Sequence, residues 1–566
     1  MKDSKTRIRI ISVAVLAFGA MLATKLYFVQ IVSGEVFSEK ADRQYTRPVG
    51  GVFNRGSIFF QAKDGTLMAA ASLKTGYTVA INPKLLKDTE AAYTALSSII
   101  ALDRDSFLAK AAKVDDPYEE IARRLDPDMA AKITNLDISG VNVYKEKWRF
   151  YPGETLASQV IGFVGYNDDM LGGQYGLENS FETVLKRDDE NLYVNFFAEV
   201  FSDLHKTLTD TGTTEGDITA TIEPHVQSFV EKQLQEIDRK FNPKLSGAIV
   251  IDPKTGEIYS MAATPSFNPN SFQTEKDANV FINPLVQSVY EMGSIIKPLT
   301  MAAGLDAGVI TAKSTYNDKG YLDLDGKTIY NFDKVGRGTV DMQQVLNQSL
   351  NTGVAYVAKQ LGSKQFAQYM LNYGFGSKTG IDLPNESKGL VENLKSRREV
   401  ERATASFGQG IAMSPISVTR ALSALANGGK LVTPHVIKKI DYKVGFSKIP
   451  TYPEPVQVIK PETSKEISRM LTEVVDVALL EGKVKMDRYS IAAKTGTAQI
   501  AHAGKYYDDR FLHSFFGYFP STDPRFLVFL YTVEPHGVEY AAHTLTEPFV
   551  NITKFLINYY EIPPDR

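Results

Sequence analysis

Residues 245–263 read LSGAIVIDPKTGEIYSMAA, and this stretch is the strongest single indicator of the fold. Two apolar, β-rich runs, SGAIVID and GEIYSMAA, flank the turn sequence DPKTG. Apolar runs on both sides of such a turn predict a hairpin of two buried strands. The sequence therefore predicts a sheet that contains this antiparallel pair.

The segments around the hairpin predict helices on the faces of that sheet. Pro224 stands where a helix would begin, and an apolar helical face follows it: Val226, Val230, Leu234, Ile237 and Phe241. A later helix is expected over residues 463–482, with Gly482 as its end. Apolar strands return at residues 489–501, 513–520 and 525–535, and residues 549–561 predict a closing helix. We therefore predict an α+β domain over residues 216–566, with a central antiparallel sheet flanked by helices.

Residues 33–215 predict a separate, mixed pedestal domain. A strand-like run at 75–83, TGYTVAINP, is followed by a helix-like run at 89–101, TEAAYTALSSIIA. A chain of 566 residues is too long for one core, so several folded units are expected.

The amino terminus predicts a membrane anchor. Basic residues within positions 1–9 precede the apolar run Ile10–Val32. As a helix, this run would rise roughly 34 Å, enough to cross a bilayer core. Positive charge before the span predicts a cytoplasmic tail at 1–9 and a single transmembrane helix at 10–32, with the rest of the chain outside the cytoplasmic membrane. The alternative is a cleaved signal peptide.

Composition excludes several classes of function. The net charge of −3 gives no reason to expect a nucleic-acid partner. The absence of cysteine excludes disulfides, thiolate catalysis and cysteine-ligated metals. The seven histidines form no HExxH pair, so we expect no metal site and no cofactor. His502, His513 and His536, near the last strands, are expected to be surface or loop residues.

Three short motifs follow one another in the larger domain. Ser294 and Lys297 form an SxxK pair, Ser349 and Asn351 form an SxN pair, and residues 494–496 read KTG. Positions i and i+3 of a helix share a face, so Ser294 and Lys297 can approach each other. Burial among Ile295, Ile296 and Leu299, together with the charge of Lys494, would favour a neutral Lys297 that can accept the serine proton.

This ordered trio is the signature of penicillin-binding proteins and β-lactamases. Almost end to end, the chain resembles a class B penicillin-binding protein, a monofunctional peptidoglycan D,D-transpeptidase. The resemblance extends over these blocks: residues 55–69, 149–166, 172–185, 260–270, 373–389, 405–429 and 514–525. The flanks of Ser294 depart from the family, since Met292 replaces a usual proline and Ile295-Ile296 replaces the commoner Thr-Phe.

The resemblance implies roles for the site residues. Ser294 would attack the penultimate D-Ala carbonyl of a stem peptide, and Lys297 would be its base. The backbone N–H groups of Ser294 and Thr497 would bind the oxyanion. Ser349 would relay a proton to the leaving nitrogen, and Asn351 would hold the substrate amide and Lys297. Lys494 and Thr495 would receive a carboxylate, while a side chain at Gly496 would block a ligand strand beside the KTG edge.

The resemblance also implies partners. The expected partners are the stem-peptide donor and acceptor, β-lactams, a glycan polymerase of the SEDS family and the bacterial cytoplasmic membrane. Residues 290–298 and 403–415 look closer to the division type than to the elongation type. The sequence is also compatible with a β-lactam hydrolase or sensor that carries the same trio, and with a non-catalytic scaffold for wall synthesis.

Overall fold

A computed structural model of the chain describes residues 18–19, 54–167, 170–187, 215–443, 445–502 and 504–566. Its described parts fall into two compact units. The smaller unit contains residues 73–148, and the larger contains residues 55–72, 149–187 and those described after 214. Residues of the predicted pedestal, 33–215, therefore belong to both units, and the predicted boundary between residues 215 and 216 stays a prediction.

The predicted membrane span lies outside the described residues, except for Phe18 and Gly19. Within the ranges that the structure describes, every helix is either too short or too polar to cross a bilayer. The span at residues 10–32 therefore stays a prediction.

The smaller unit packs three short helices against strands β2, β3 and β4. Its elements are the second half of β2 (Leu67–Ile81), α3 (Thr89–Ser97), α4 (Arg104–Ala111), β3 (Glu119–Leu125), α5 (Pro127–Thr134) and β4 (Val141–Phe150). Each helix begins after an aspartate whose side chain accepts a hydrogen bond from the first turn: Asp88, Asp103 and Asp126. Val79, Leu96 and Phe107 meet in its core. The predicted strand and helix at 75–83 and 89–101 are both present.

The larger unit begins with small elements held by a buried ion network. These elements are β1 (Ile58–Gln61), α6 (Ser158–Ile161), β5 (Val164–Asn167), β6 (Met170–Gly173), α7 (Gly176–Ser180) and α8 (Glu182–Leu185). The Glu178 carboxylate accepts hydrogen bonds from Arg55 Nε and Arg149 Nε, each at 2.6 Å. Breaking a buried, fully paired charge of this kind typically costs about 3–5 kcal/mol, so this cluster fixes the fold of the segment.

The centre of the larger unit is a five-stranded antiparallel sheet in the order β18-β19-β20-β8-β9. The strands are β8 (Leu245–Ile251), β9 (Ile258–Thr264), β18 (Ala492–His502), β19 (Lys505–Phe519) and β20 (Phe526–Val533). The predicted hairpin is β8–β9, and β18, β19 and β20 are the predicted late strands. The prediction of a central antiparallel sheet is confirmed.

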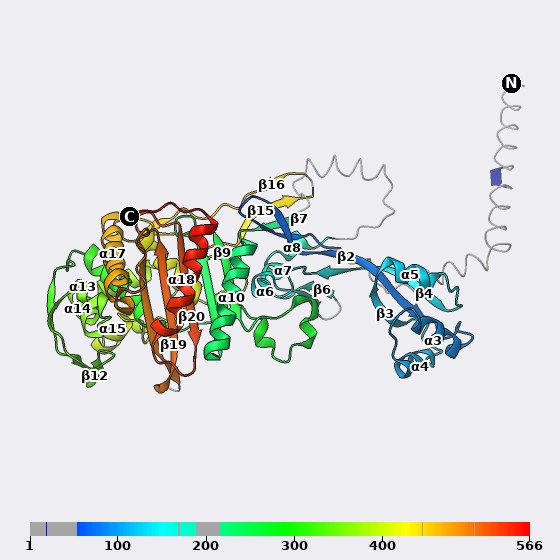
Figure 1. Cartoon of the computed structure of the whole chain (residues 1–566), viewed down its shortest axis with the longest axis horizontal. Coiled ribbons are helices and arrows are strands. Elements are labelled where there is room, and N and C mark those ends of the chain that lie inside the picture. Colours follow the sequence, from blue (N-terminus) through cyan, green and yellow to red (C-terminus); the bar gives the residue numbers. More distant parts are fainter. Residues whose placement is uncertain (1–17, 20–53, 168–169, 188–214, 444, 503) are drawn as a thin grey trace, which may run out of the picture. The chain divides into compact units, whose positions relative to one another are not determined.

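Both faces of this sheet are covered, which explains the near-continuous apolar strands. Ala248 and Val250 pack toward helices α10 (Pro224–Phe241) and α18 (Ala541–Tyr559), which lie side by side on one face (Figure 1). Ile249 and Ile251 join the core on the opposite face. Alternate residues of a strand point to opposite faces, so a strand buried on both sides must be apolar at every position.

The opposite face carries the remaining helices and small hairpins. The helices are α11 (Pro284–Gln287), α12 (Lys297–Asp306), α13 (Met342–Asn347), α14 (Asn351–Asn372), α15 (Glu399–Ala405), α16 (Pro415–Ala426) and α17 (Pro461–Glu473). The small two-stranded pairs are β10 (Thr315–Asp318) with β13 (Gly338–Asp341), β11 (Tyr321–Leu324) with β12 (Lys327–Tyr330), and β14 (Lys430–Leu431) with β17 (Val456–Gln457). Strands β7 (Gly216–Ala220), β15 (Ile437–Tyr442) and β16 (Ser447–Lys448) belong to a separate sheet, in which the strand order runs β16-β15-β7-β1-β2. Short 3₁₀ turns connect several of these elements.

Two helix boundaries differ from the sequence prediction. The helix expected to run to Gly482 leaves α-geometry after Glu473, because a π-turn follows and Leu480 has a positive φ of 47°. The closing helix α18 begins at Ala541, eight residues before the predicted start at 549. It contains Pro548, and proline inside a helical pattern is normally read as a boundary.

Candidate active site

Ser294 lies in a 3₁₀ turn, Gly293–Ile296 (η4), that leads directly into α12. A 3₁₀ turn eclipses positions i and i+3, so Ser294 and Lys297 lie on the same side of this segment. Gly293 has a φ of 65°, and a Cβ at this position would lie 3.0 Å from the carbonyl oxygen of Thr497. Glycine at 293 therefore allows the serine turn to pack closely against β18.

Lys297 is the first residue of α12 and only 1% of it is exposed. Its Nζ donates hydrogen bonds to the main-chain oxygen of Ser349 at 2.5 Å and to Ser349 Oγ at 3.1 Å. The SxxK and SxN motifs, which are 52 residues apart at these two positions, therefore meet in space.

Ser349 occupies a strained turn before α14. Its φ is 53°, a left-handed conformation that costs a non-glycine residue about 1–3 kcal/mol. Asn351 begins α14, and its Nδ2 donates to the main-chain oxygen of Tyr330 at 2.8 Å. Within the described residues, both hydrogen bonds of Lys297 go to Ser349, so the contact of Asn351 differs from the one expected. The role of Asn351 stays a prediction.

The KTG motif lies on β18, the edge strand of the five-stranded sheet. Among the strands that the structure describes, β18 pairs only with β19. Lys494 is 4% exposed, and its Nζ donates to the main-chain oxygen of Thr495 at 3.0 Å. Thr497 Oγ1 accepts a hydrogen bond from the backbone N–H of Ala541, at the start of α18, at 3.1 Å.

These motifs open into one groove of about 1110 Å³. Seven of the eight predicted site residues line it: Ser294, Lys297, Ser349, Asn351, Lys494, Thr495 and Thr497. The eighth, Gly496, does not line it. A volume of this size accommodates a peptide segment, and the free edge of β18 allows an extended ligand to add as a further strand.

Both buried lysines have lowered pKa values, and the shift of Lys297 has two causes. Burial lowers the pKa of Lys297 well below its ordinary value, and the positive charge of Lys494 lowers it further. Burial lowers the pKa of Lys494 to about 8, so this amine is mostly charged at neutral pH. Paired titratable groups whose environments separate their pKa values typically divide acid, base and binding roles between them. Here a neutral Lys297 can accept a proton while a charged Lys494 can bind a carboxylate.

Comparison with known protein families agrees with this geometry. Residues 246–553 match the family "Penicillin binding protein transpeptidase domain", and residues 53–216 match the "Penicillin-binding Protein dimerisation domain". This chain belongs to the class B penicillin-binding proteins.

Relatives of this penicillin-binding protein match over most of their length. "Stage V sporulation protein D" of Bacillus subtilis is 30% identical over 97% of this chain and 85% of its own. "Probable peptidoglycan D,D-transpeptidase PenA" of Neisseria meningitidis is 26% identical over 100% of this chain and 94% of its own.

Solved structures show the same fold. Penicillin binding protein 3 of Mycobacterium tuberculosis matches with a TM-score of 0.65 and 25% identity, over 74% of this chain and 92% of that chain. Penicillin binding protein 2X of Streptococcus thermophilus matches with a TM-score of 0.72 and 21% identity, over 90% of this chain and 81% of that chain.

The expected reason for Gly496 is wrong for this penicillin-binding protein. A Cβ at this position would lie 2.4 Å from Ser514 Oγ, 2.9 Å from the main-chain oxygen of Met292 and 3.0 Å from the backbone nitrogen of Ile295. It would therefore collide with the neighbouring strand and with the serine turn, not with a ligand beside the strand edge.

Gly496→Ala is consequently expected to displace the Ser294 turn. Overpacking of this kind typically costs about 1–3 kcal/mol, and a shift of the nucleophile lowers the acylation rate by about 100-fold. The second-order rate of labelling by a fluorescent penicillin measures this effect. Gly172→Ala is the matched control, because its Cβ would lie at an ordinary 3.5 Å from Glu182 Oε1. Wild-type labelling of Gly496→Ala would contradict the prediction.

His513 is not a surface residue, contrary to the sequence prediction. It lies in β19 opposite Thr497 and is completely buried. Its Nε2–H donates to the main-chain oxygen of Glu539 at 2.9 Å, and its Nδ1 lies 3.0 Å from Thr544 Oγ1. The imidazole therefore connects the sheet to the start of α18.

Burial lowers the pKa of His513 to about 4, which predicts acid sensitivity. Below an unfolded-state pKa of about 6.5, the unfolded chain binds a proton that the folded chain excludes, so stability is complete above pH 6.5 and falls toward pH 4. The expected loss between pH 7 and pH 5 is about 2 kcal/mol in the urea-unfolding free energy. His513→Gln should show a loss smaller by that amount; an unchanged pH dependence would contradict the assignment.

Sequence reasoning missed several residues around the groove. Tyr330, Asn331 and Phe332 line it from the segment that follows α12, and Tyr540 lines it from the loop before α18. The rings of Phe332 and Tyr540 meet edge to face, with centroids 6.0 Å apart. The run YLDLDGKTIY at 321–330 carries a hairpin signal, and Tyr330 ends the resulting strand β12. Nothing in the sequence, however, places that hairpin or Tyr540 beside the motif residues.

Proposed function

We propose that this penicillin-binding protein is a peptidoglycan D,D-transpeptidase that acts through a Ser294 acyl-enzyme. The observation that carries the proposal is the meeting of three motifs at one groove. Ser294 and Lys494 line it, and Lys297 bonds there to Ser349. Relatives named peptidoglycan D,D-transpeptidase support the same reaction.

Acylation begins with the loss of the Ser294 proton to the neutral amine of Lys297. Ser294 Oγ then attacks the carbonyl carbon of the penultimate D-Ala of a stem peptide, and the negative charge develops on the carbonyl oxygen. The backbone N–H groups of Ser294 and Thr497 are the proposed donors to that oxygen. Ser349, 3.1 Å from Lys297 Nζ, passes the proton to the departing nitrogen, and the terminal D-Ala leaves as a neutral amine.

Transfer completes the reaction with the roles reversed. An amine of a neighbouring stem peptide attacks the Ser294 ester, loses a proton to Lys297, and forms an amide cross-link while Ser294 recovers its own proton. The net change exchanges one amide bond for another, so no cofactor or redox partner is required. Water in place of the acceptor amine would give hydrolysis.

Substrate orientation is assigned to the edge of β18. The terminal carboxylate of the donor peptide is proposed to bind the charged Lys494 and the hydroxyl of Thr495. The donor backbone would then lie along Thr497 as an added strand, a mode in which main-chain hydrogen bonds supply affinity. Asn351 is proposed to bind the substrate amide. A β-lactam would enter the same way and remain attached to Ser294.

The cellular setting follows from the resemblance. We propose that residues 10–32 anchor the enzyme in the bacterial cytoplasmic membrane, with the catalytic unit outside and a SEDS-family glycan polymerase as partner. A septal role is proposed because residues 290–298 and 403–415 resemble the division type. A fluorescent fusion of this protein is expected at division sites. A fusion found along the lateral wall and absent from division sites would assign the protein to elongation instead.

Intact-mass measurement after exposure to benzylpenicillin tests the proposed reaction. The expected result is one adduct per chain that maps to the peptide containing Ser294 and persists for minutes or longer. D-Ala release from a synthetic stem pentapeptide, with cross-linked product when an acceptor amine is added, completes the assignment. Rapid turnover of a chromogenic cephalosporin would indicate a β-lactam hydrolase, and the absence of both adduct and D-Ala release would indicate a scaffold.

A further inference from the structure

Two nested hairpins follow α12 and end beside the SxN motif. The outer pair is β10–β13 and the inner pair is β11–β12. Asp318 is the last residue of β10, so it lies at the junction of the two hairpins. It is 2% exposed and does not line the groove, so it does not contact a substrate there.

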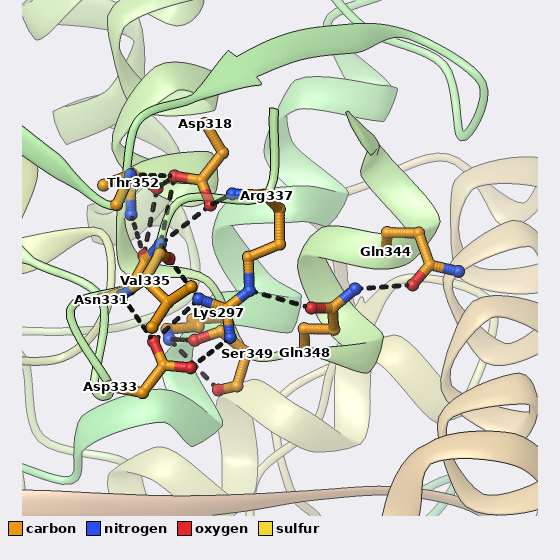
Figure 2. Close-up of polar contacts among 11 residues, drawn as sticks. Lys297, Asp318, Asn331, Asp333, Val335, Arg337, Gln344, Gln348, Ser349 and Thr352 are labelled. Atoms are coloured by element: carbon orange, nitrogen blue, oxygen red, sulfur yellow. Dashed lines mark hydrogen bonds and ion pairs between the residues drawn. The ribbon is translucent and has the colours of Figure 1, made fainter. Parts of the chain in front are cut away.

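The Asp318 carboxylate gathers donors from four separate segments (Figure 2). It accepts hydrogen bonds from two backbone nitrogens, that of Gly320 at 2.9 Å and that of Arg337 at 3.1 Å. It accepts from Asn331 Nδ2 at 3.0 and 3.1 Å, and from Thr352 Oγ1 at 2.8 Å. A single carboxylate thereby joins both hairpins to the first turn of α14.

The first turn of α14 depends on this junction for its cap. Leu350, at the N-cap position, provides no side-chain hydrogen bond. Instead Asn331 Oδ1 accepts from the backbone nitrogen of Thr352 at 3.2 Å, and the Thr352 hydroxyl that donates to Asp318 lies 3.1 Å from the same oxygen. Asn331 is 1% exposed, and Asp318 holds its amide in the orientation that caps the helix. The start of α14, two residues after Ser349, is thus held by Asn331, which follows strand β12.

A second link reaches the chain on the other side of Ser349. Arg337 Nε donates to Gln348 Oε1 at 3.0 Å, while the backbone nitrogen of Arg337 bonds to Asp318 (Figure 2). Gln348 and Thr352 enclose the turn in which Ser349 adopts its positive φ. A strained residue keeps its conformation only where its surroundings determine it, and these two links supply that constraint.

We propose that Asp318 is a positioning residue for acyl transfer. Through Asn331, Thr352 and Arg337 it holds the Ser349 turn in the position where Ser349 bonds to Lys297. The inference rests on the proposed function of the site. Lys297 donates to the main-chain oxygen of this turn and is only 1% exposed, so a displaced turn would both release the amine from this contact and admit water beside it. The charged group facing that amine is Lys494, on β18.

Asp318→Asn tests the proposal with an almost unchanged shape. An amide has one acceptor oxygen where the carboxylate has two, so at least one of the four donors would face an NH₂ group. The expected result is an acylation rate for benzylpenicillin lowered by about 100-fold. Water entry beside Lys297 should also move the acid limb of the pH–rate profile upward by about one pH unit.

Thr352 supplies a second, milder variant. Thr352→Val keeps the side-chain shape but removes the hydroxyl that donates to Asp318 and lies 3.1 Å from Asn331 Oδ1. We expect about a tenfold lower acylation rate and the same upward movement of the acid limb, and we expect Thr352→Ser to restore both. The Asp318→Asn/Thr352→Val double variant should be no worse than Asp318→Asn, because both changes act on one network.

Glu386→Gln is the matched control for a buried carboxylate. Glu386 is 8% exposed and accepts from the backbone nitrogens of Thr379 and Gly380, away from the groove. It should keep the wild-type acylation rate and pH profile even if its melting temperature falls. A wild-type protein that forms no adduct would refute the proposed function itself. A wild-type protein that acylates, with Asp318→Asn and Thr352→Val acylating at the same rate and with the same acid limb, would refute only the positioning role.

Discussion

Ser294→Ala is expected to form no covalent adduct with benzylpenicillin and to release no D-Ala from a stem pentapeptide. The hydroxyl is the only group in the proposed mechanism that bonds to the acyl carbon, and the remaining oxyanion donors cannot replace it. The structure predicts little change in stability, because Ser294 is only partly buried in the groove wall. Intact-mass analysis with peptide mapping measures the adduct, and a melting curve confirms that the variant is folded.

Ser387→Ala is a suitable control for that experiment. Ser387 is partly buried and donates to the main-chain oxygen of Gln287, outside the groove. It should acylate like the wild type. An adduct on Ser294→Ala, whatever its position, would show that another residue is the nucleophile.

Lys297→Met is expected to lower the acylation rate by about 10²- to 10⁴-fold, the usual contribution of a general base. Methionine resembles the lysine stem in length and can fill the same buried space, but it has no atom that accepts the Ser294 proton. The loss should appear in the rate of the chemical step measured at saturating β-lactam. The affinity of the initial, non-covalent complex should change little.

Lys297→Arg distinguishes a base from a simple positive charge. A guanidinium stays protonated at every accessible pH, so it preserves charge but cannot accept a proton. If Lys297 acts as the neutral base that its burial favours, the arginine variant should be as slow as the methionine variant. Recovery of a substantial part of the rate by arginine would assign Lys297 an electrostatic role instead.

The central sheet was predictable because its strands are continuously apolar and the first two are separated by a recognisable turn sequence. The β8–β9 hairpin shows its turn as DPKTG, and burial on both faces makes its strands apolar throughout. Helix α10 was equally clear, since Pro224 marks its start and its apolar face repeats with helical spacing. The break after Glu473 was not visible, because the same apolar spacing continues through the π-turn.

The residues that line the site were predictable, whereas the residues that hold them in position were not. Ser294, Lys297, Ser349 and Lys494 lie in short motifs whose order is itself a signal, and the structure brings all four to one groove. Asp318 instead acts through tertiary contacts with residues up to 34 positions away. Nothing near Asp318 in the sequence indicates those partners, because they meet only after the two hairpins and α14 have folded.

A motif residue can be recognised in the sequence although the structural reason for it is not visible there. Gly496 was recognised as part of KTG, but the atoms that require a glycine there belong to Met292, Ile295 and Ser514. These residues come from a different strand and from the serine turn. Similarly, the complete burial of His513 follows from its place in β19 beneath the start of α18, and the strand pattern alone did not reveal it.

Among the strands that the structure describes, β18 pairs on one edge only, and its other edge creates a risk of self-association. A free row of backbone donors and acceptors can pair with the same strand of a second copy, and exposed edges are common starting points for aggregation. Exposed charges at the far end of the β18–β19 hairpin, at Lys505, Asp508, Asp509 and Arg510, oppose such pairing. Neutralising them should therefore lower the highest protein concentration at which the chain stays monomeric.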